Sequence, residues 1–128
     1  MAQTSEKFES VRIAQDSIWT SENVAQALST TFANVLVLKQ LKGSKQTNII
    51  FKNLHASIGE NYRVFVSNDP DSTDDVTGVS WHEKISSTAV AALATADIEI
   101  TGSYSKIIVQ ANSASGTPTC SLWSKSRN

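Results

Sequence analysis

The densest group of oxygen ligands in the sequence is the acidic stretch from Asp69 to Asp75. Its four carboxylates, Asp69, Asp71, Asp74 and Asp75, are of the type that Ca²⁺ binds, because that ion takes about six to eight oxygen ligands. The spacing departs from an EF-hand loop: Asp74 holds the sixth position, which requires Gly, and Ser80 holds the twelfth, which requires Glu. We therefore predict no metal site. The stretch is expected to be a solvated turn between two strands, with these carboxylates as candidate loop contacts to a partner.

Other residues that perform chemistry are sparse. His55, His82 and Cys120 are the only His and Cys side chains, and their spacing matches no known zinc pattern. Cys120 has the character of a small core residue, and no Gly-x-Ser-x-Gly nucleophile elbow is present. A carboxylate pair for glycoside hydrolysis, such as Glu83 and Glu99, stays open as an alternative. The sequence predicts a protein that is not an enzyme, with no catalytic residue and no cofactor.

Composition narrows the class of protein. The 128 residues suit one domain, the hydrophobic fraction of 40% suffices for a core, and the net charge is -1. The basic residues are dispersed, whereas nucleic-acid binders carry a basic stripe, so no nucleic-acid partner is expected. The polar N-terminus has no apolar signal region, and the apolar run at 90–94 is too short to span a bilayer. We expect a protein made in a cytoplasm and not bound to a membrane.

Strand patterns dominate the sequence. Eight runs alternate in polarity or are rich in β-branched residues, and turn-forming residues separate them; the runs are 8–14, 34–39, 48–54, 62–67, 79–85, 98–101, 104–110 and 119–124. This spacing predicts an all-β fold, an antiparallel two-sheet β-sandwich of jelly-roll type with about eight strands. In one run, Tyr62, Val64 and Val66 should share a face. Segments 21–28 and 88–96 fit either a short helix or an extended strand.

The N-terminal part of the chain is the candidate assembly segment. We divide the chain into residues 1–20, an arm with the first strand, and residues 21–128, a single sandwich domain. Phe8, Val11 and Ile13 lie in the first alternating run, and Trp19 lies outside the predicted strands. A large aromatic supplies contact area at low entropic cost, so these four residues are the predicted assembly contacts.

The order of turns and strands between about residues 35 and 125 resembles small β-sandwich proteins of tailed-bacteriophage virions. The segments that carry the resemblance are VFVSND at 64–69, VSWHE at 79–83, GSYSKIIV at 102–109 and GTPTCSLW at 116–123. The chain departs from that pattern at Pro70, where Gly is common, and in the length of the loop that follows.

The resemblance implies a structural role. Such proteins decorate or cement capsids, form head fibres or sit in tails. A capsid decoration or cement protein is therefore expected, in the virion and assembled in the host bacterial cytoplasm. Its partners would be the major capsid protein or other virion proteins, and it would be a homo-oligomer. The alternative is a receptor- or carbohydrate-binding module of a tail fibre or spike.

Overall fold

The chain is all-β. The computed structural model describes the backbone of residues 18–39 and 45–127 and the side chains of 25–39 and 45–126. The eight strands are β1 (Ile18–Ala27), β2 (Ala33–Leu38), β3 (Gln46–Asn53), β4 (Glu60–Ser67), β5 (His82–Val90), β6 (Thr95–Thr101), β7 (Lys106–Ser113) and β8 (Thr119–Arg127). The run at 8–14, with Phe8, Val11 and Ile13, lies outside the described residues.

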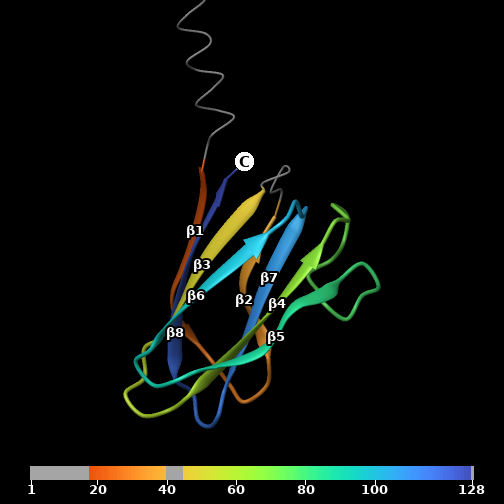
Figure 1. Cartoon of the computed structure of the whole chain (residues 1–128). Coiled ribbons are helices and arrows are strands. Elements are labelled where there is room, and N and C mark those ends of the chain that lie inside the picture. Colours follow the sequence, from red (N-terminus) through yellow and green to blue (C-terminus); the bar gives the residue numbers. More distant parts are fainter. Residues whose placement is uncertain (1–17, 40–44, 128) are drawn as a thin grey trace, which may run out of the picture.

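The strands pair like a single long hairpin that has been rolled up. β1 pairs with β8, β2 with β7, β3 with β6 and β4 with β5, all antiparallel, so the tip of the hairpin is the β4–β5 connection. Two further pairings, β3 with β8 and β4 with β7, complete two four-stranded sheets. We name them the β1 sheet (order β1-β8-β3-β6) and the β2 sheet (order β2-β7-β4-β5). They stack face to face (Figure 1). This is the predicted jelly-roll sandwich.

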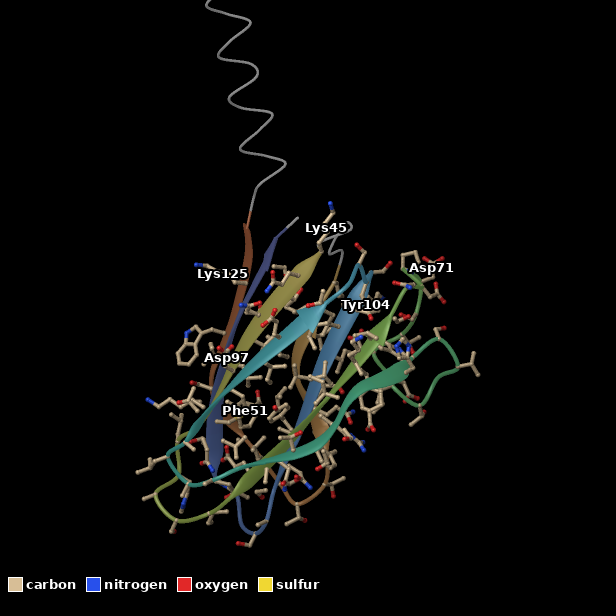
Figure 2. All side chains as sticks on the ribbon, viewed as in Figure 1. Lys45, Phe51, Asp71, Asp97, Tyr104 and Lys125 are labelled. Carbon is tan, nitrogen blue, oxygen red and sulfur yellow. The ribbon has the colours of Figure 1, made fainter. Side chains whose placement is uncertain are left out.

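The core lies between the sheets because each strand turns alternate side chains inward. Tyr62, Val64 and Val66 of β4 are buried together, which confirms the predicted shared face. Across the sandwich, the ring of Phe51 lies 5.6 Å from that of Tyr62, measured between centroids. Figure 2 shows Phe51 in this interior. Cys120 is fully buried in the same cluster, so its predicted place in the core is confirmed.

Neither ambiguous segment is helical: the first belongs to a strand, and the second is two strand ends joined by a tight turn. Residues 21–27 belong to β1, which has a bulge where its register shifts between Asn23 and Gln26. At this bulge Ala25 has a φ of 59°, a left-handed conformation that costs about 1 kcal/mol for a residue other than Gly. In segment 88–96, β5 runs to Val90, a tight turn with Leu93 at φ 59° follows, and β6 begins at Thr95. Pairing with neighbouring strands decides the conformation of both segments, which local propensity left open.

Two strand assignments were wrong. Trp19 does not lie outside the strands, since it is part of β1 and pairs with Ser126 of β8. The run expected at 79–85 begins only at His82, because two consecutive turns precede it: Gly78 N–H donates to Asp75 O and Trp81 N–H to Gly78 O. As a result Val79 is fully exposed while Trp81 is buried, and they do not share a strand face.

Candidate interaction surfaces

The acidic loop between β4 and β5 folds back over the outer face of the β2 sheet. Buried Lys106 of β7 donates a hydrogen bond from Nζ to the carbonyl oxygen of Ser72. Asn34 Nδ2 donates to the Asp74 carbonyl oxygen at 2.9 Å, and Lys39 Nζ lies 3.2 Å from Asp74 Oδ2. The loop is therefore tied to β2 and β7, and the expectation of a plain solvated turn missed this docking.

A second, smaller hydrophobic cluster holds the loop in place. Its buried members are Val76, Trp81 and Ile108, with Val37 and Phe65 packed against them. The indole Nε1–H of Trp81 donates to the carbonyl oxygen of Thr73 at 2.9 Å, so the polar edge of the buried ring is satisfied. Apolar burial on the outside of a sheet explains why a loop rich in aspartate lies against the protein.

Two of the predicted loop carboxylates accept hydrogen bonds from residues of the same loop. Asp69 Oδ1 accepts the N–H of Asp71 at 2.9 Å, and its Oδ2 accepts the Ser80 hydroxyl at 3.1 Å. Asp75 Oδ1 accepts both the hydroxyl and the N–H of Thr77. Both hydrogen bonds lower the pKa of Asp75, and the bond from the Thr77 hydroxyl has the larger effect. The side chains of Asp69, Asp71, Asp74 and Asp75 are all exposed, so a partner could still reach them.

The loop should not depend on calcium. Within residues 18–39 and 45–127, no group of three or more His, Cys, Asp or Glu side chains is placed to hold a metal ion. A ligand at a hundred times its Kd would stabilise the fold by about 2.7 kcal/mol, a shift of several degrees in melting temperature. We expect no such shift on adding calcium, measured by thermal denaturation with and without chelator. A rise of several degrees that the chelator reverses would contradict this prediction.

The remaining candidates for chemistry do not assemble. Burial, with a smaller contribution from Glu60, raises the pKa of Cys120 to about 12, so its thiol does not form a nucleophilic thiolate near neutral pH. The ring nitrogen of His55 accepts the N–H groups of Ser57 and Ile58 and so stabilises a turn.

The two glutamates of the open glycosidase alternative are equally unpromising. Glu83 is on β5 of the β2 sheet, whereas Glu99 is on β6 of the β1 sheet, and both side chains are exposed. Glu99 accepts a hydrogen bond from Gln46 at 3.0 Å. Because the two side chains are exposed on different sheets, the structure does not bring them together as a carboxylate pair.

The outer face of the β1 sheet is a mixed surface around an exposed tryptophan. Trp123 of β8 is 37% exposed and lies directly across from Ile50 of β3, which is half-buried. Asp97 is opposite Ile50 on β6, and Lys125 is two residues along β8. Figure 2 shows Asp97 and Lys125 on this side of the sandwich, away from Asp71. An apolar centre with a charged rim is the usual arrangement of a protein contact surface.

β1 forms the edge of the same sheet. Among the described strands it pairs only with β8, and it is ten residues long. Glu22 is the one charged residue in its sequence. Two other edge strands have more features that discourage the addition of a further strand. β5, at an edge of the β2 sheet, has Glu83, Lys84 and register shifts, and β6, at the far edge of the β1 sheet, has Asp97 and Glu99. β1 has a bulge of its own between Asn23 and Gln26, but it has fewer charged residues than β5 or β6. Charges discourage strand addition, so of these three edges β1 is best suited to accept another strand.

Comparison with known proteins identifies structures of similar fold but no family to which the chain belongs. No family model matches the chain, and no curated protein matches it. The solved structure of the PBSX exported protein XepA has a TM-score of 0.60 at 10% identity, over 85% of this chain and 37% of that one. Tripeptidyl peptidase 2 has a TM-score of 0.56 at 10% identity, over 88% of this chain and 10% of that one.

A third structural match extends over nearly its whole length. It is a protein of the Bacillus endospore appendages, described as disulfide-linked pili, with a TM-score of 0.50 and 14% identity over 88% of this chain and 90% of that one. At such identities the likeness establishes a shared fold, and one fold hosts many functions. No helix that could cross a bilayer occurs in the described part of the chain.

Proposed function

We propose that this chain is a non-enzymatic structural protein of a bacteriophage virion. Its expected role is capsid decoration or cementing, in the virion and assembled in the host cytoplasm. It would bind the major capsid protein or other virion proteins and form a homo-oligomer. Residues 1–20 would supply the arm and the first strand, and residues 21–128 the sandwich. The resemblance of its strands and turns to phage virion sandwiches supports this proposal.

The edge position of β1 carries the proposal. The predicted arm enters the sandwich directly through this strand, which has a long edge with a single charged residue. Extended segments of neighbouring subunits can add to such an edge through backbone hydrogen bonds. Trp19 lies on β1, so the predicted contact residue is at this edge, and exposed Trp123 lies on the adjoining strand.

The shared fold with a pilus protein is consistent with an assembly role. Endospore appendages are disulfide-linked, but this chain has one cysteine, and Cys120 is completely buried. A disulfide through Cys120 would require opening the core. An assembly of this protein would therefore hold together through non-covalent contacts, at the β1 edge and over the Trp123 face.

Deletion of residues 1–10 tests the arm. Ordering a polar segment costs about 1–2 kcal/mol per residue, which only contacts with a neighbour would offset. We therefore expect the truncated protein to remain folded, with an unchanged circular dichroism spectrum, but to enter virions in reduced copy number. The measurement is mass spectrometry of purified particles, with copy number taken against the major capsid protein.

Matched variants of the full-length chain separate apolar contacts from chain length. Replacing Phe8, Val11 and Ile13 together by Ser should reduce incorporation as the deletion does. Replacing the polar residues Gln3, Thr4 and Glu6 by Ser should leave it unchanged. Normal incorporation of both the truncated and the Ser-substituted apolar variants would refute the role of the arm, and absence of the intact protein from particles would refute the virion assignment.

A further inference from the structure

Arg63 of β4 lies close to two aromatic rings on the outer face of the β2 sheet. Its guanidinium carbon lies 4.1 Å from the centroid of the Phe32 ring and 5.2 Å from that of Phe65. All three side chains are half-buried. Stacking of a guanidinium on aromatic faces is favourable and restricts the plane of the group. The guanidinium is thus fixed in orientation before any ligand arrives.

A chain of hydrogen bonds also restrains Arg63. Arg63 Nε–H donates to Gln110 Oε1, Gln110 Nε2 donates to Asn34 Oδ1, and Asn34 Nδ2 donates to the Asp74 carbonyl oxygen, each at 2.9 Å. All donors point the same way along this relay, so each bond polarises the next. The relay connects β4, β7 and the start of β2 to the acidic loop.

The relay leaves the outer edge of the guanidinium unused. Within the described residues, Arg63 makes no ion pair, and its one hydrogen bond uses Nε. The two terminal amino groups keep four N–H donors in a planar fork. The acidic side chain tied to the relay, Asp74, pairs with Lys39 instead. A half-buried, oriented and uncompensated guanidinium is matched by a planar carboxylate, which binds it through two parallel hydrogen bonds.

Two amide side chains lie on the same face beside Arg63. Asn61 precedes Arg63 by two residues on β4, and its Nδ2 donates to Asn112 Oδ1 at 3.1 Å. Asn112 in turn donates to the Thr30 carbonyl oxygen at 3.1 Å. Each amide retains an N–H and an acceptor lone pair, since an Asn side chain has two donors and two acceptor sites. Groups that both donate and accept are complementary to hydroxyls.

The geometry points to a binding site for a carboxylated saccharide, with Arg63 holding the carboxylate and Asn61 and Asn112 holding neighbouring hydroxyls. A sugar acid carries both kinds of group on one rigid ring, whereas an acidic peptide supplies the carboxylate without the hydroxyls. The site lies on the β2 sheet, while the proposed assembly edge belongs to the β1 sheet. The two roles are independent, and either can fail alone.

NMR titration of the isolated full-length protein tests the site. The probes are a galacturonate oligosaccharide, a hyaluronan tetrasaccharide and sialyllactose, with neutral lactose and a galactan oligosaccharide as controls. We expect saturable shifts from at least one carboxylated probe, centred on the Arg63 Nε–H and the side-chain amides of Asn61, Gln110 and Asn112. The neutral sugars should cause none. No shift from any carboxylated probe overturns the proposal.

Variants establish which groups bind. R63Q and R63K should both weaken binding about tenfold or more, because Lys keeps the charge but loses the planar fork. N61A is a milder second variant that should also weaken it. The matched control is K84Q, which removes another cation stacked on a ring, 5.7 Å from the Tyr104 centroid on the same sheet. K84Q should bind as the wild type does.

Two further results would overturn the proposal. One is that R63Q binds the saccharide as tightly as the wild type does, while circular dichroism shows that the variant is folded. The other is a glutamate-rich peptide that binds through Arg63 as tightly as any saccharide, which would make the site a receptor for protein carboxylates.

Discussion

Substituting Glu60 by Gln is expected to remove a large pH-dependent loss of stability. Glu60 begins β4, is 1% exposed, and neither of its carboxylate oxygens has a hydrogen-bond partner among the described residues. Burial raises its pKa from 4.5 to about 7. The charged form is therefore disfavoured in the folded protein and favoured in the unfolded chain.

The direction of the pH effect follows from proton uptake. Between pH 4.5 and about 7 the folded protein binds the proton that the unfolded chain has released. The free energy of unfolding therefore falls as pH rises through this interval, by about 3 kcal/mol in total, and is constant above it. Below 4.5 the contribution is fully present, because Glu60 is protonated in both states.

Denaturant titrations of wild type and E60Q at several pH values measure this effect. Other carboxylates titrate equally in both proteins, so they cancel in the difference. E60Q should gain about 3 kcal/mol relative to wild type between about pH 4.5 and pH 8. A constant difference over that range would show that Glu60 is not buried as a carboxyl group.

Replacing Trp81 by Ala is expected to release the acidic loop. Trp81 is 7% exposed and anchors the cluster with Val76 and Ile108. Truncation of a buried Trp costs about 3–5 kcal/mol. Here the loss also removes the bond from Nε1 to Thr73, so the loop should open before the sandwich unfolds. Urea denaturation measures the cost, and limited proteolysis should find new cleavage sites between residues 68 and 81.

W123A is the matched control for W81A. Trp123 is 37% exposed on the other sheet, so its truncation should cost less stability than that of buried Trp81. It should leave the loop protected from protease. If W81A cost no more than W123A, the packing of the loop on the β2 sheet would be wrong.

Strand periodicity was the reliable signal in this sequence. The alternation around Tyr62, Val64 and Val66 identified β4 and its buried face, and the same pattern located β3, β6, β7 and β8. It also misled where an apolar residue stood in a turn. Val79 continued the alternation towards Trp81, but the turns after Asp75 place it in solvent. Period two reports which face is buried only where the backbone is extended.

Only part of the Arg63 site could be predicted from the sequence. Alternation in β4 turns Arg63 and Phe65 outward because Tyr62, Val64 and Val66 turn inward. Phe32 and Gln110 are distant from Arg63 in the chain. Pairing of β4 with β7 places Gln110 opposite Arg63, and the ring of Phe32, just before β2, reaches the guanidinium from outside the strands. Nothing in the sequence indicated that the polar side chain of Glu60 lies on the buried face of its strand.

By itself, the sequence determined the fold class, the positions of most strands, the buried face of β4 and the small number of groups suited to catalysis. These depend on local residue types and on the period of two along a strand. Tertiary structure alone decided that residues 21–27 are a strand, that the acidic loop packs on the β2 sheet, and that Arg63 meets Phe32, Phe65 and Gln110. Each of these depends on contacts between distant segments, whose free energy exceeds the small local preferences of the chain.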